Sequence, residues 1–298
     1  TLRSATQERL RWLVGQVGEE FASFLLAGAC LGKQFSIDHS LAATGTVTPP
    51  AFDKAVALCF DYDVLKPTRG RGTSEIAFDH DLVRSAILEA AGAKSIAMMS
   101  GKLLDARPEI GDYPSAILGY LAGRANVCIA AAAHLLADAK ANKNRLDAVQ
   151  FALLRAVPLI ASDAIAQKAD FLRPHVEDID EALGYVDAPR LASRPSPQQM
   201  IPAFRDLLSE MENVGMLEGG LAERIITLAQ MHAGYAADDC ALSEFVYFEG
   251  RRLFGTNRYA EAYHQFLEAE RIWPGGAVSR AAELAPIRLR QAICERHL

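Results

Sequence analysis

Apolar residues recur at every third or fourth position through nearly all of this 298-residue chain. That spacing lines one face of a helix, whereas a half-buried strand needs alternation at every second residue. Half of the residues are hydrophobic, so these helices can bury a sizeable core. The sequence therefore predicts a mainly α protein, and its length allows two domains or one domain followed by a helical array.

The first hundred residues also contain a β signal. Two short extended runs, "YDVLKP" at 62–67 and "EIAFDH" at 75–80, flank the Gly-rich basic turn "TRGRGTS", which predicts a hairpin. Helices are expected around this hairpin, at 5–31, 36–43 and 51–61 and from Asp79 onward. Three helices, a two-stranded wing and a following helix predict a winged-helix domain at 1–95.

The stretch "FLLAGACLGKQFS", residues 24–36, contains glycines and a lysine in an order that suggests a phosphate-binding loop. That motif requires Gly, four residues and then Gly-Lys-Ser/Thr, directly after a strand. Here Gly28 is one residue too close to Gly32, Gln34 replaces the hydroxyl residue, and the stretch continues a helical pattern. The sequence therefore argues against a nucleotide site at this position.

Beyond residue 100 only helices are expected, in a helical repeat region at 96–190 and in tetratricopeptide-like repeats at 191–298. The proline-rich stretch 187–199 is the most loop-like part of this half. The repeat pattern combines small residues, aromatics and a terminal proline, and the matching residues are Gly250, Tyr259, Ala262, Phe266, Ala269 and Pro274. Small residues let two antiparallel helices touch, aromatics fill the gaps, and proline ends the second helix. An ordinary helical hairpin is the alternative, because an array needs at least three repeats.

The segments "GKQF" at 32–35 and "IAFDHDLVRSAIL" at 76–88 resemble the winged-helix region of the signal-transduction ATPases with numerous domains, the STAND class. Those proteins carry a winged helix after a nucleotide-binding domain, and often a tetratricopeptide array after that. The resemblance covers about residues 2–95 and, as a repeat-type match, 241–298. It implies that Phe35 inserts into the winged-helix core. It also implies an upstream domain that binds ADP or ATP, with no cofactor in this chain itself.

Asp79-His80-Asp81 resembles the Met-His-Asp motif of this class, in which the histidine contacts the β-phosphate of ADP and holds the inactive state. The resemblance implies that His80 senses the nucleotide state, and the free N–H groups of a helix start suit phosphate. Asp79 departs from the motif and adds a negative charge. His80 should then be partly exposed, without a buried carboxylate partner. The alternative is that His80 packs under the wing while Asp79 or Asp81 caps the helix.

The wing residues Lys66, Arg69 and Arg71 raise the possibility of DNA binding or of an interdomain contact, since wings often touch the DNA backbone. Two observations argue against DNA. The helix expected to read the groove, with the residues that follow it, contains three acids and one lysine, and the net charge of the chain is −6. Phosphate would be repelled by such a surface.

Composition limits the remaining classes of function. The chain has no familiar catalytic motif, no metal-ligand spacing and no apolar run long enough to cross a membrane. Its five scattered cysteines are typical of a reduced, cytoplasmic protein. Because the chain begins at Thr1, we expect it to be a piece of a longer protein.

These observations predict a non-catalytic regulatory arm of a STAND signalling ATPase. Its winged helix would relay the nucleotide state of the upstream domain, and its helical repeats would bind a protein partner or a small-molecule inducer. The alternative is a DNA-binding winged-helix transcriptional regulator with a helical ligand- or protein-binding domain.

Overall fold

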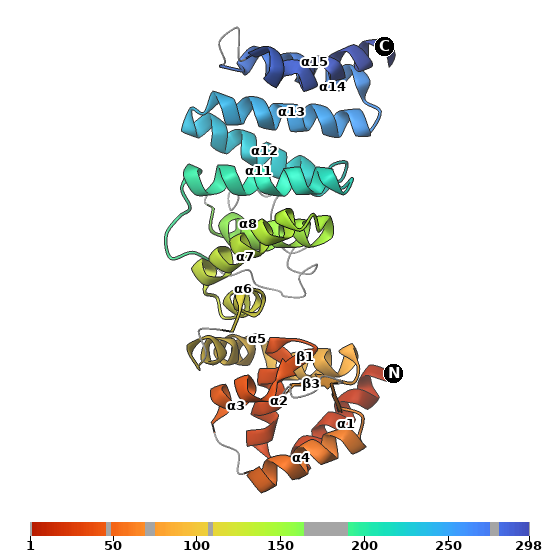
Figure 1. The fold of residues 1–298 in the computed structure, drawn as a ribbon, viewed down its shortest axis with the longest axis vertical. Coiled ribbons are helices and arrows are strands. Elements are labelled where there is room, and N and C mark those ends of the chain that lie inside the picture. The colour runs from red at the N-terminus through yellow and green to blue at the C-terminus, as the bar shows by residue number, and fades with distance from the viewer. Residues whose placement is uncertain are drawn as a thin grey trace. The chain divides into compact units, whose positions relative to one another are not determined.

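The computed structural model describes residues 2–45, 49–68, 75–106, 110–163, 190–274 and 280–297. It confirms the mainly α fold, with three short strands in the N-terminal part (Figure 1). The chain divides into two compact units, the first ending at Ala131 and the second beginning at Ala132.

The first unit contains a small antiparallel sheet among helices. Its elements are α1 (Leu2–Val17), α2 (Glu19–Leu31), β1 (Gln34–Ser36), α3 (Ile37–Thr44), α4 (Pro49–Asp61), β2 (Leu65–Pro67), β3 (Glu75–Phe78), α5 (Asp81–Ala106), α6 (Asp112–Leu121) and the start of α7 (Ala125–Ala141). The strands lie in the order β1-β3-β2, with Phe35 opposite Ile76 and Leu65 opposite Phe78. Helices, a β-hairpin and a following helix occur in the predicted order, and membership of the winged-helix class stays a prediction.

Two local predictions for this unit were wrong. The single helix expected at 5–31 is two helices, because Gly18 between them has a φ of +87°, a conformation that side-chain-bearing residues rarely adopt. The sheet has three strands rather than two, since Gln34–Ser36 pairs with β3. Three residues are too few to show a period of two in the sequence.

Gly28 has a packing role beside an aromatic cluster. The rings of Phe24 and Phe35 lie 5.9 Å apart, and those of Phe35 and Phe78 lie 5.0 Å apart. A Cβ atom added to Gly28 would lie 2.5 Å from the ring of Phe35, which is 3% exposed. The glycine in the apparent phosphate loop therefore makes room for Phe35, whose predicted insertion into the core is confirmed.

Helix α5 belongs to two apolar cores. Its first half contributes Val83 and Ala86 to the core that contains the aromatic cluster. Its second half contributes Met99 and Leu103 to a separate core with α2 and α6. Between the halves, Gly92 has a φ of +72°, so the helix is kinked where one core gives way to the other. The domain boundary predicted after residue 95 falls inside this helix.

The second unit is a stack of antiparallel helices. It contains the end of α7, then α8 (Arg145–Ser162), α11 (Pro197–Asn213), α12 (Gly220–Ala236), α13 (Asp239–Gly255), α14 (Tyr259–Ile272) and α15 (Arg280–His297). Helix α11 packs against α8 and α12, α12 against α13, α13 against α14, and α14 against α15. Figure 1 shows α11 to α15 following one another in layers. Two complete hairpins, α11–α12 and α13–α14, thus pack in series, as repeats do.

Candidate functional site

The chain between β3 and α5 presents His80. The backbone N–H of Phe78 donates to the carbonyl of Lys33, and that of Asp79 donates to the carbonyl of Val64, at 2.8 and 3.1 Å. The first helical bond of α5 then runs from the N–H of Val83 to the carbonyl of His80, at 3.0 Å. The sheet therefore fixes the backbone on one side of His80, and α5 fixes it on the other.

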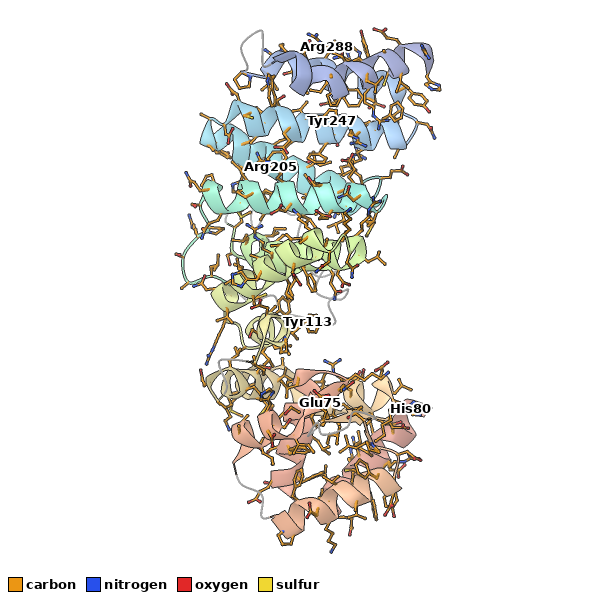
Figure 2. All side chains as sticks on the ribbon, viewed as in Figure 1. Glu75, His80, Tyr113, Arg205, Tyr247 and Arg288 are labelled. Carbon is orange, nitrogen blue, oxygen red and sulfur yellow. The ribbon has the colours of Figure 1, made fainter. Side chains whose placement is uncertain are left out.

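The imidazole of His80 lies at the surface (Figure 2). Its side chain is 75% exposed, and Nε2 lies 3.2 Å from Oδ2 of Asp79, whose side chain is 26% exposed. The expected exposure of His80 therefore agrees with the structure, while its carboxylate partner, Asp79, is partly buried. The alternative in which His80 packs under the wing does not agree with the structure. Nucleotide sensing by His80 stays a prediction.

Two lysines complete the charged group around the start of α5. The Nζ atom of Lys66 on β2 lies 3.5 Å from Oδ1 of Asp79 and donates to the carbonyl of Asp79 at 3.1 Å. Lys33 lies 3.2 Å from both carboxylate oxygens of Asp81. Lys66 is therefore engaged within its own unit, while Arg69 and Arg71, the other predicted wing residues, lie outside the described residues.

The predicted repeat residues meet in the hairpin of α13 and α14. Ala262, Phe266 and Ala269 are fully buried. A Cβ atom added to Gly250 would lie 2.5 Å from the ring of Phe266, so the small residue admits the large one. Tyr259 packs against Phe254 with ring centres 5.3 Å apart, and Pro274 follows two residues after the end of α14. The arrangement is the one expected of a repeat hairpin.

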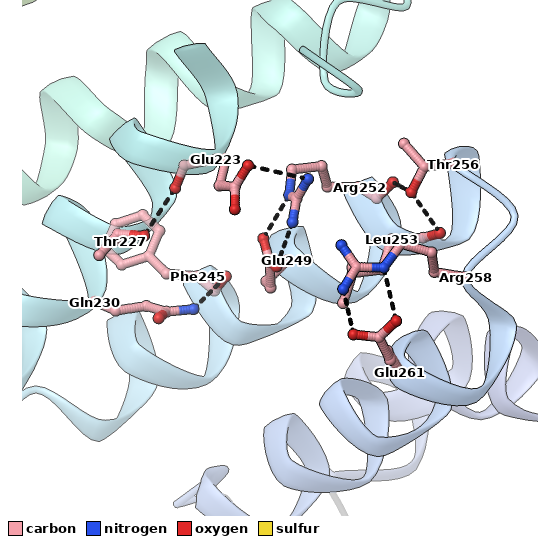
Figure 3. A network of polar contacts seen from close by, with 10 residues as sticks. All are labelled: Glu223, Thr227, Gln230, Phe245, Glu249, Arg252, Leu253, Thr256, Arg258 and Glu261. Carbon is pink, nitrogen blue, oxygen red and sulfur yellow. Dashed lines mark hydrogen bonds and ion pairs between the residues drawn. The ribbon is translucent and has the colours of Figure 1, made fainter. Parts of the chain in front are cut away.

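Figure 3 shows a polar network between α12 and α13 that the sequence did not reveal. The Arg252 side chain is 6% exposed and donates from Nε and Nη2 to Glu249 at 2.8 and 2.7 Å. Its Nη1 lies 3.6 Å from Glu223 of α12. Hydrogen bonding to Glu249 raises the pKa of Arg252 above its ordinary value, so the guanidinium stays charged. The dipeptide "RR" gave no indication of which arginine is buried.

A second buried pair, also missed in the sequence, joins α8 to α12. His232 Nε2 lies 2.9 Å from Oδ2 of Asp163, and the two side chains are 5% and 6% exposed. The ring of His232 also faces Phe204 at 5.8 Å. Because 69 positions separate His232 from Asp163, no local pattern connects them. The pair ties the end of α8 to a helix of the following hairpin.

Two guanidinium groups lie over aromatic rings in α13. Arg251 lies 5.8 Å from the ring centre of Tyr247, and Arg290 of α15 lies 5.0 Å from that of Phe254. Arg251 also pairs with Glu212 of α11. Burial raises the pKa of Glu212, and the charges of Arg251 and Arg290 oppose that rise. These contacts place arginine and aromatic groups together on α13 and between α13 and α15.

A groove of about 800 Å³ lies between α1, α2 and α5. Its volume falls within the range of small-molecule sites. Charged Arg11, Glu19 and Glu89 and several apolar residues line it, among them Leu10, Val14, Leu25, Leu26 and Ile87. Helices α1 and α2 are consecutive, but α5 lies about 50 residues further along the chain, so sequence reasoning did not bring these residues together.

Three buried cysteines show no activation. Burial raises the pKa of Cys30 to about 11, and those of Cys59 and Cys128 to about 12. These thiols stay protonated near neutral pH and are poor nucleophiles. Within the described residues, no three His, Cys, Asp or Glu side chains are grouped as a metal site would require. The same residues include no helix with the length and apolar character of a membrane span.

Comparison of the chain with protein families, with curated proteins and with solved structures found no match.

Proposed function

We propose that this chain is a regulatory part of a STAND-class signalling ATPase, acts in the cytoplasm and has no catalytic role of its own. The sheet-containing unit relays the state of a bound nucleotide through His80. The helical hairpins bind a protein partner or an inducer. The observation that carries the proposal is the 75% exposed imidazole at the start of α5, on a backbone fixed by the sheet and the helix.

The position of His80 suits contact with a phosphate. An imidazole N–H donates a hydrogen bond to a phosphate oxygen, and the N-terminal end of a helix favours negative charge. With its backbone bonded on both sides, His80 needs only side-chain rotation to reach a ligand. Such a residue signals nucleotide loss by losing one strong bond, which moves the balance between closed and open states.

The hairpins offer chemistry suited to a protein partner. Tyrosine and arginine dominate the energetics of many protein interfaces. Arg251 over Tyr247 combines both types, and Arg290 lies over Phe254, which is on the same helix as Tyr247. A partner identified with the full-length protein and then purified should bind wild type and lose affinity for the Tyr247→Ala/Arg290→Ala double variant. The Leu289→Ala variant, which changes an exposed neighbour on α15, is the control.

The nucleotide role is tested in the full-length protein that contains this chain. His80→Ala should weaken ADP binding by about 10- to 100-fold, because a charge-assisted hydrogen bond contributes about 1.5–3 kcal/mol. His264→Ala, which removes an exposed histidine from α14, should bind ADP like wild type. Titration calorimetry measures both affinities. If the protein does not bind ADP, or if the two variants bind equally, the proposed function is wrong.

A further inference from the structure

His80 already has an anionic partner in its own chain. Its Nε2 atom lies 3.2 Å from Oδ2 of Asp79, a distance at which a protonated imidazole forms an ion pair with a carboxylate. In the related motif a methionine precedes the histidine and offers no such acceptor. Asp79 thus changes the surroundings of the atom that the proposed function assigns to phosphate.

Asp79 is held more firmly than His80. Its N–H donates to the carbonyl of Val64 at 3.1 Å, and its carbonyl accepts from Lys66 at 3.1 Å. Its carboxylate also lies 3.5 Å from Lys66, and the side chain is 26% exposed against 75% for His80. If the contact between the two residues breaks, the exposed imidazole therefore moves and the carboxylate stays beside β2.

We propose that Asp79 is a positioning residue that competes with a nucleotide phosphate for His80, an inference that rests on the proposed function of this histidine. The Nε2–H group donates to one strong acceptor at a time. Asp79 holds it when no nucleotide is bound, and a phosphate must displace that contact. The fixed carboxylate also repels the phosphate, so both effects favour nucleotide release.

The competition is modest because the imidazole of His80 is 75% exposed. Exposed ion pairs contribute little to a folded structure. Removing the Asp79 carboxylate should therefore tighten ADP binding by about two- to fivefold. Asp81 is a matched control, since it lies two residues away with the same charge but pairs with Lys33 rather than with His80.

The first experiment needs no nucleotide. Nitrogen NMR spectra of the His80 ring are compared in this chain with wild type, Asp79→Asn and Asp81→Asn. We expect the Nε2 resonance to move in Asp79→Asn and to stay near its wild-type position in Asp81→Asn. An unchanged His80 spectrum in a folded Asp79→Asn protein would overturn the inference without touching the proposed function. Asp79→Met, which restores the residue type of the motif, repeats the test if the Asn variant does not fold.

The second experiment measures ADP affinity in the full-length protein. Asp79→Asn should tighten binding more than Asp81→Asn, and in the His80→Ala background the two substitutions should have equal effects. Equal effects in the presence of His80 would show that only local charge matters, and the inference would be wrong. If His80→Ala weakens binding and Asp79→Asn leaves it unchanged, the inference fails while the proposed function stands. If neither wild type nor any variant binds ADP, both the inference and the proposed function are wrong.

Discussion

In the hairpins α11–α12 and α13–α14, the second helices bury residues with the same spacing, whereas the first helices differ. Ala222, Ile226 and Ala229 in α12 are at most 1% exposed, and Ala262, Phe266 and Ala269 in α14 are fully buried with the same spacing. In the C-terminal hairpin the large central residue faces a glycine of α13, namely Gly250.

Only the C-terminal hairpin carries a recognisable sequence pattern. Its two helices are joined by the short turn 256–258, whereas 214–219 connect α11 to α12. The comparison teaches that the same small-large-small pattern is buried in both second helices, although α11 contains no glycine to face it. In the C-terminal hairpin, Gly250, the short turn and Pro274 allow this packing to be predicted from the sequence.

The largest expected effect is that of removing the central side chain. Phe266→Ala should lower the free energy of unfolding by about 3–5 kcal/mol and Ile226→Ala by about 2–5 kcal/mol, because each leaves a cavity between paired helices. Chemical unfolding measures both. Leu267→Ala, at a neighbour that is 41% exposed, should change little. A Phe266→Ala protein as stable as wild type would show that the hairpins do not share this packing.

Breaking the buried arginine network should have the next largest effect. Arg252→Ala removes hydrogen bonds to a charged group and should lower the free energy of unfolding by about 1.5–3 kcal/mol. Its exposed counterpart is Arg271, which pairs with Glu268 and has a side chain that is 72% exposed. Arg271→Ala should lower the free energy of unfolding much less, because exposed ion pairs contribute little to stability. Equal losses for the two variants would contradict a specific role for the α12–α13 contact.

Two helical glycines should respond with opposite signs. Gly250→Ala places a methyl group 2.5 Å from Phe266 and should destabilise by about 1–3 kcal/mol through overpacking. Gly234→Ala in α12 meets nothing within 4 Å and should stabilise by about 0.5–1 kcal/mol. Thermal melting distinguishes the signs. Stabilisation by Gly250→Ala would mean that Phe266 can move aside, and the difference between the hairpins would then be unimportant.

The smallest effect concerns pH. Burial raises the pKa of Glu212 above its ordinary value of 4.5, so the folded state binds this proton more tightly than the unfolded state. The associated stability is present below the ordinary value and is lost as pH rises through the raised one. Wild type should therefore gain stability relative to Glu212→Gln when the pH falls through this window. Glu268 has a lowered pKa because of Arg271, and Glu268→Gln should give the opposite trend. If both substitutions changed the pH dependence of stability in the same direction, the raised pKa of Glu212 would be contradicted.

The family resemblance implied the burial of Phe35, and the repeat pattern predicted that Gly250 and Phe266 pack together. Sequence periodicity predicted the helices, because it depends on residues close together in the chain. It missed the break at Gly18, since the apolar spacing continues across that position and only the backbone angle shows the break. It also missed two pairs, Arg252 with Glu223 and His232 with Asp163, because these pairs depend on how separate helices pack. The exposed position of His80 followed from a motif, whereas the carboxylate contact of Asp79 required coordinates.

The kink in α5 has a consequence for how this chain tolerates mutation. A Cβ atom at Gly92 would meet nothing within 4 Å, yet its φ is +72°. The space around Gly92 would admit a side chain, but almost every other residue disfavours this φ and would strain the backbone. A saturation library should therefore show an isolated intolerant site surrounded by permissive ones, because a φ of 72° with a ψ of 161° is essentially restricted to glycine.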